Sequence, residues 1–279
     1  MPQNWLKIKK ARSDLTDYLI HWTRSSNADG VRRSPFEVLQ SILECGYLKP
    51  SFATRTSAFA SGPGRHTVRG PRPAVCFTEQ PLSAFLNSCG ALPNRYKPYA
   101  VAVKKDRLFE YGGRPVIYGD SNLLHSLPDH QKFLWVPFQP TPNASLGGYP
   151  IDWTHEREWR STVNNYNASA HGAYLTDGVP LLLPPTESNL FLPWVLVRSR
   201  AEAVEMRRWM NCLPDYAGSN VLMSLYRAKL RHTPIIPLDV VAERLSNGES
   251  LWARIDTLPY SELEPEVAEQ FERLGWDSA

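Results

Sequence analysis

Short β-prone runs recur along the chain, and their order constrains the fold more than any other feature of the sequence. Five such runs in the first two thirds are predicted to be strands, with turn or loop residues between them. They cover residues 17–23, 73–79, 96–106, 114–120 and 156–163. A nearly continuous apolar run at residues 190–199 predicts one further, buried strand.

Helical patterns complete the prediction. In the clearest, "SPFEVLQSILECG", Ser34 caps a helix, Pro35 takes its first position, Glu37 completes a capping box and Gly46 ends it. The other predicted helices cover residues 81–89, 130–138, 199–210, 219–232 and 264–276, with a second capping box formed by Ser199 and Glu202. Strands dominate early and helices late, so the fold class is predicted to be α+β. We expect a domain over residues 1–200 and a helical C-terminal extension over 201–279 that packs on it.

Composition limits the functional classes. The chain has 279 residues, 42% of them hydrophobic, which suits one large or two small domains. No apolar run reaches the roughly 18 residues of a membrane span, and the charged start "MPQNWLKIKKARSD" does not resemble a signal peptide, so we expect a cytoplasmic protein without a membrane partner. Four scattered cysteines predict neither disulfides nor a metal site.

Local charge is more informative than the net charge of +3. No acidic residue lies between Glu44 and Glu79, and the interval is rich in Gly, Ser, Pro and Arg. This composition predicts a long basic loop, either a nucleic-acid-binding segment or a solvated insertion without a ligand. The candidate nucleic-acid-binding residues are Arg55, Arg65, Arg69 and Arg72.

The segment "DWTHEREWR", residues 152–160, concentrates titratable groups beside two tryptophans. If it is an extended strand, Glu156 and Glu158 share one face, with Arg157 and Trp159 on the other. Fixed carboxylates stabilise a developing cation, such as the oxocarbenium-like sugar formed when a glycosidic or nicotinamide riboside bond breaks. The alternative is an exposed, ion-paired strand with no catalytic role.

Polar residues near the ends of two other predicted strands favour the catalytic interpretation. His21 follows apolar residues in "LIHWT", and Thr78 and Glu79 end "VCFTE". Each alone is compatible with a satisfied core or surface residue. Together with the glutamate pair, they predict a site built from three strands.

The motifs "LIHWTR", "ILECGYLKPS", "AVCFTEQPLSAF", "YAVAVKKD", "GGRPVIYGD" and "DWTHEREWR" occur in an order that resembles bacterial abortive-infection proteins of the AbiGi type. They also resemble, more distantly, the ADP-ribosyltransferase superfamily. The resemblance covers roughly residues 17–165. It implies a split, strand-rich fold that holds NAD as a substrate, in a phage-defence or toxin effector.

The resemblance also implies roles for individual residues. His21, with Thr23 and Arg24 beside it, would hold the ribose or phosphates of NAD, and Phe77 and Thr78 would line the nicotinamide. Glu158 would support the cationic transition state, and Glu156 would help to activate the acceptor. Phe77 stands where the better known pattern has a tyrosine.

Two other classes of function stay open. The first is a cofactor-independent nuclease or phosphotransferase, in which His21 and His155 act on RNA. The second is a non-catalytic antitoxin or interaction protein that docks through its helical C-terminal third. The acceptor of a transferase could be a nucleic acid or a protein.

Overall fold

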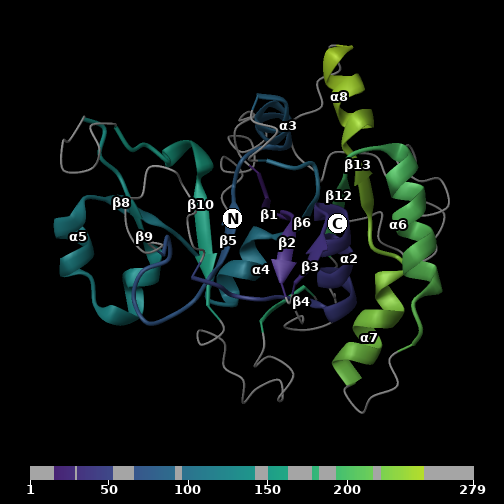
Figure 1. The fold of residues 1–279 in the computed structure, drawn as a ribbon, viewed down its shortest axis with the longest axis horizontal. Helices are drawn as coiled ribbons and strands as arrows, with labels where there is room; N and C mark the ends of the chain where they lie inside the picture. Colours follow the sequence, from purple (N-terminus) through teal and green to yellow (C-terminus); the bar gives the residue numbers. More distant parts are fainter. Residues whose placement is uncertain are drawn as a thin grey trace, which may run out of the picture. The chain divides into compact units, whose positions relative to one another are not determined.

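The computed structural model describes residues 16–28, 30–52, 66–91, 96–141, 150–162, 178–181, 193–215 and 221–247. Helices and strands are mixed along these residues (Figure 1), which confirms the α+β class. The described chain forms two compact units. Unit 1 draws on Met1–Tyr47, Gln80–Lys105 and Leu181–Ala279, and unit 2 on Leu48–Glu79 and Asp106–Pro180.

Four strands of unit 1 pair side by side in the order β13-β12-β6-β1. Their bounds are Tyr18–Trp22 for β1, Ala100–Lys104 for β6, Trp194–Val197 for β12 and Ile235–Pro237 for β13. β6 is antiparallel to both β1 and β12, whereas β13 runs parallel to β12. A mixed sheet results. Because side chains alternate along a strand, Tyr18, Ile20 and Trp22 face one side of β1, and Leu19 and His21 face the other.

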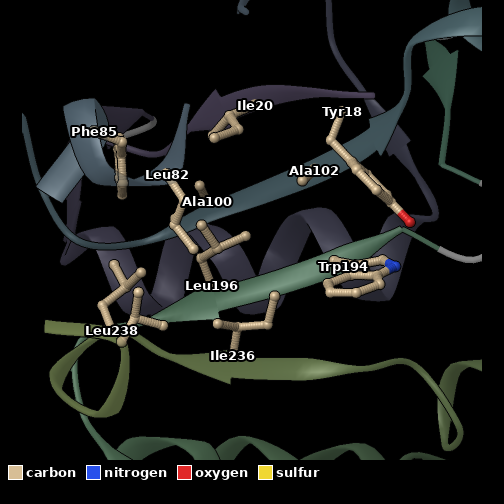
Figure 2. Close-up of a cluster of buried hydrophobic side chains, with 11 residues drawn as sticks. Tyr18, Ile20, Leu82, Phe85, Ala100, Ala102, Trp194, Leu196, Ile236 and Leu238 are labelled. Atoms are coloured by element: carbon tan, nitrogen blue, oxygen red, sulfur yellow. The ribbon is translucent and has the colours of Figure 1, made fainter. Parts of the chain in front are cut away.

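The hydrophobic core of unit 1 lies on the Tyr18 side of these strands (Figure 2). The rings of Tyr18 and Trp194 pack at 5.0 Å between centroids. Two helices cover this face, α3 (Leu82–Ala91) through Leu82 and Phe85, and α8 (Leu238–Ser246) through Leu238. Burial of these large apolar side chains, each worth about 1.5–3 kcal/mol, stabilises the unit.

Capping sets the start and end of α2 (Pro35–Cys45), as predicted. The Glu37 amide donates to Ser34 Oγ at 3.2 Å, and the Ser34 amide donates to Glu37 Oε2 at 2.6 Å. Gly46 ends the helix at φ 76°, a left-handed conformation that glycine adopts without strain. Unit 1 also contains the hairpin of β2 (Ser26–Ala28) and β3 (Val31–Arg33), and the helices α6 (Arg200–Cys212) and α7 (Val221–Leu230).

Unit 2 is built around three strands in the order β5-β10-β7. β10 (Glu158–Ser161) is antiparallel to both β5 (Val75–Thr78) and β7 (Arg114–Pro115). A second pair, β8 (Ile117–Gly119) and β9 (Trp135–Pro137), is parallel. Helical and short elements complete the unit and its borders: α4 (Lys105–Glu110), α5 (Ser121–Ser126), η1 (Asp129–Leu134), η3 (Thr154–Glu156), β4 (Tyr47–Leu48) and β11 (Val179–Pro180).

Several element predictions need correction. A helix was expected over residues 130–138, but the structure has the short 3-10 helix η1 followed by strand β9. The strand expected over 114–120 is divided into β7 and β8. The helix predicted over 264–276 lies outside the described residues. Unit 1 draws on residues from both sides of position 200, and the boundary predicted there stays a prediction.

Candidate functional site

Glu158, the principal candidate acid, opens strand β10 and is fixed through its backbone. It pairs with Thr78 of β5 in the antiparallel register. Its amide donates to the Tyr118 hydroxyl at 3.1 Å, and its carbonyl accepts from the Val116 amide at 3.0 Å. Val116, between β7 and β8, and Tyr118 of β8 therefore both lie beside the start of β10, and Tyr118 brings its hydroxyl to the backbone of the glutamate.

The carboxylate of Glu158 binds a buried arginine. Its Oε1 accepts from Arg160 Nε at 2.8 Å. Arg160 is only 2% exposed, and its Nη1 also donates to the carbonyl oxygens of Phe133 at 2.6 Å and Trp135 at 3.1 Å. Burial is the largest single influence on the pKa of Arg160 and lowers it, but the charge of Glu158, together with Cys76 and the hydrogen bonds to both, raises the pKa above its ordinary value. A buried guanidinium needs this set of acceptors.

Cys76 completes the polar group on this face. It lies directly opposite Arg160 in the β5–β10 register, so the two side chains and Glu158 share one face of the strands. Burial, followed by the charge of Glu158, raises the pKa of the Cys76 thiol to about 12. The thiol is therefore neutral at physiological pH and is a poor nucleophile.

The strand predicted over 156–163 is correct for residues 158–161 and wrong for 156, 157 and 162, and residue 163 lies outside the described residues. Glu156 ends the 3-10 helix η3, and Arg157 has a left-handed φ of 45° that turns the chain into β10. The Thr78 hydroxyl donates to the Glu156 carbonyl oxygen and fixes this turn. Strand alternation therefore does not relate Glu156 to Glu158.

The two glutamates instead have a common neighbour, Tyr118, whose hydroxyl is affected by the charges of both. Burial is the main cause that raises the pKa of its phenol, and the charges of Glu158 and Glu156 raise it further. Both carboxylates thus act electrostatically on one hydroxyl, and the Glu156 side chain is only 12% exposed. Tyr118 was not predicted from the sequence, because its position 40 residues before Glu158 gives no spacing signal.

The opposite face of β10 carries a different set of contacts. Trp159 pairs with Phe77 in the register, so both point away from Glu158. Trp159 Nε1 donates to Glu79 Oε2 at 2.8 Å, and Arg157 Nη2 lies 3.6 Å from Glu79 Oε1. A ligand held against Glu158 would therefore contact Thr78 rather than Phe77.

The candidates from the first predicted strand lie in unit 1. His21 is partly exposed on β1, on the opposite face from Tyr18 and Ile20. Thr23 is buried, and its hydroxyl donates to the Pro35 carbonyl oxygen at 2.8 Å, which anchors the start of α2. Arg24 is exposed. A common site for these residues and the glutamates of unit 2 stays a prediction.

The basic segment is described only in part. Arg55 and Arg65 lie outside the described residues. Arg69 lines an open hollow of about 280 Å³ together with Phe52, His66, Val68 and Gly70. Arg72 is partly exposed two residues after Gly70. Among the described residues, no group of three or more His, Cys, Asp and Glu side chains is arranged to hold a metal ion.

Comparison with known proteins found no match for this chain. No family model matches the chain, and no curated protein does so. No solved structure matches it either. Within the described part of the chain, every helix is too short or too polar to cross a membrane.

Proposed function

We propose that this chain is an NAD-consuming ADP-ribosyltransferase-like protein that acts in the cytoplasm as a phage-defence or toxin effector. The observation that carries the proposal is the negative charge that Glu158 and Glu156 both exert on the Tyr118 hydroxyl, which contacts the start of β10. The α+β fold with its mixed sheet is compatible with this class but does not distinguish it from others.

In the proposed reaction, the bond between nicotinamide and ribose C1′ breaks, and its electron pair leaves with nicotinamide. The ribosyl group becomes cationic, an acceptor nucleophile attacks C1′, and the acceptor loses a proton. Glu158 and Glu156 supply fixed negative charge, which stabilises the cation more strongly in a partly dry site than in water. Arg160 positions Glu158 through the 2.8 Å contact between Nε and Oε1.

Tyr118 is assigned a supporting role. Its oxygen accepts from the Glu158 amide at 3.1 Å, so its own hydrogen points to a different acceptor. Its raised pKa keeps the phenol neutral at physiological pH, and a neutral phenol can donate to a ribose hydroxyl. We assign Thr78 to the same face as Glu158, where it holds the Glu156 turn.

The test is release of nicotinamide from NAD in the presence of mixed nucleic acids and proteins. The native chain is compared with Glu158→Gln, with Tyr118→Phe and with Glu110→Gln, an exposed glutamate on α4 of the same unit. We expect release by the native chain and by Glu110→Gln, and strongly reduced release by Glu158→Gln. Equal release by all four proteins would remove Glu158 from the role proposed here.

The same assay separates the other classes. Cleavage of RNA without NAD, unchanged in Glu158→Gln, would replace the proposal by a nuclease or phosphotransferase. Absence of both activities from the folded native chain would contradict an enzyme and favour an antitoxin or interaction protein.

A further inference from the structure

The hollow beside the basic segment has the composition of a nucleobase site. Phe52 and His66 lie with ring centroids 5.3 Å apart and their planes tilted by 51°. Val68, which is 1% exposed, gives the hollow an apolar wall, and Arg69 adds a cation. Flat aromatic bases stack on phenylalanine and histidine rings, and arginine binds the phosphates that flank them.

The shape of this hollow is fixed by close packing within unit 2. Gly70 has φ +78°, and a Cβ there would lie 2.9 Å from Lys132 Cβ and 3.0 Å from the Asp129 carbonyl oxygen. The loop therefore rests directly on η1. The Val68 amide also donates to the Phe52 carbonyl oxygen at 3.3 Å, which ties the two sides of the hollow together.

The charge around the hollow favours a polyanion over a free nucleotide. Residues 45–78 contain no acidic side chain, and Lys49, Arg69 and Arg72 are spread along the described part of this segment. Beside Gly70, Asp129 is neutralised by Lys132 Nζ at 2.6 Å. Separate cations suit successive phosphates of a strand, and only an unpaired base offers its face for stacking.

We infer that this hollow binds single-stranded nucleic acid, with one base stacked on the Phe52–His66 pair and Arg69 on a flanking phosphate. The inference rests on the proposed function in one respect: if the chain is an ADP-ribosyltransferase, the bound single strand would be the acceptor of the ADP-ribosyl group. Binding itself needs no NAD, so it fails or succeeds independently of the glycosyl transfer.

The experiment is fluorescence anisotropy of the full chain with labelled uridylate and thymidylate strands of about 12 nucleotides, a length within the range of known single-strand sites. It is done without NAD over a series of salt concentrations. Phe52→Ala is expected to weaken binding about tenfold, whereas Phe52→Tyr keeps the native affinity. Arg69→Gln is expected to reduce the slope of log affinity against log salt by about 0.7, the value for one phosphate of a single strand.

Matched controls come from elsewhere in the chain. Phe109→Ala removes an exposed ring that is 49% accessible, and Arg208→Gln removes an exposed cation on α6. Both are expected to bind like the native chain. Native-like binding by Phe52→Ala and Arg69→Gln, equal losses in the two controls, or no binding by the native chain would overturn the inference. Equal affinity for a duplex, or full competition by uridine monophosphate, would overturn the assignment to single strands.

Discussion

Replacement of Glu158 by glutamine leaves the buried guanidinium of Arg160 without its counter-charge, and the loss of stability can be worked out from the contacts. Breaking a buried ion pair costs about 3–5 kcal/mol. The side chain of Glu158 is 18% exposed and that of Arg160 is 3% exposed, so water that reaches the Glu158 end of the pair relieves part of the loss. We expect Glu158→Gln to lower the free energy of unfolding by about 3 kcal/mol, the lower end of that range.

Arg160→Met should cost more. It removes the ion pair and also leaves the carbonyl oxygens of Phe133 and Trp135 without the donor that they share. We expect a loss of about 5 kcal/mol, because unsatisfied buried acceptors add to the lost pair. The double variant should lose little more than Arg160→Met alone, since the partner of Glu158 is already absent.

Urea unfolding followed by tryptophan fluorescence measures all four proteins, and the chain has nine tryptophans. A midpoint about 1 M lower is expected for Glu158→Gln. The double-mutant cycle formed by these four proteins should give an interaction energy between Glu158 and Arg160 of about 3 kcal/mol. Additive losses, or a Glu158→Gln variant as stable as the native chain, would show that the pair does not stabilise unit 2.

Three further predictions follow from local contacts. Ser34→Ala removes the cap of α2 and should lower the free energy of unfolding by about 1 kcal/mol; an unchanged urea midpoint would contradict the capping role. In the native chain at pH 8, a maleimide should label the exposed Cys45 but not Cys76, whose pKa is about 12, and mass spectrometry of the labelled peptides measures this. The pKa of Tyr99 is raised from 10.0 to about 12, first by burial and then by its bond to Glu202. The stabilising contribution of the Tyr99 hydroxyl is therefore complete below pH 10 and is lost as the pH rises toward 12. The difference in urea midpoint between the native chain and Tyr99→Phe should shrink over that pH range.

Local chemistry explains which elements the sequence could predict. The start of α2 depends on the side chain of Ser34 and the carboxylate of Glu37, and its end on the left-handed Gly46, all within 13 residues. Buried strands such as β12 consist of consecutive apolar residues and were also found. At Ser199 the prediction was half correct. Its hydroxyl accepts from the Glu202 amide, but the Glu202 carboxylate accepts from the Arg198 amide instead of returning to Ser199.

Elements without such local signals were missed. α8 and β13 follow each other directly at Pro237, so neither showed a separate period in the sequence. The left-handed Arg157 was equally hidden, because arginine carries no preference for that conformation. Because Arg157 is left-handed, Glu156 lies at the end of the 3-10 helix η3 and Glu158 lies on strand β10. The two glutamates are therefore not neighbours on one face of a strand.

The candidate site depended on contacts at long range. Tyr118 and Cys76 join the glutamates from β8 and β5, 40 and 82 residues from Glu158 along the chain. Only the register of β5 with β10, and the packing of β8 beside them, creates this group. Sequence reasoning could identify the acidic pair, but it could not identify the partners that set the electrostatics of the pair.

Those partners bear on which glutamate is the principal acid. At Tyr118 the charge of Glu158 acts more strongly than that of Glu156, and Arg160 offsets part of both. Glu156 therefore adds to the field at this hydroxyl, and its carboxylate also lies 3.8 Å from Nε2 of the exposed His155. We expect Glu156→Gln to reduce nicotinamide release about 100-fold, the effect of removing one preorganised electrostatic group. The free energy of unfolding of this variant should change by less than about 1 kcal/mol, because a 3.8 Å ion pair with an exposed histidine contributes little. Native release from Glu156→Gln, together with complete loss in a folded Glu158→Gln, would instead make Glu158 the principal acid despite its ion pair.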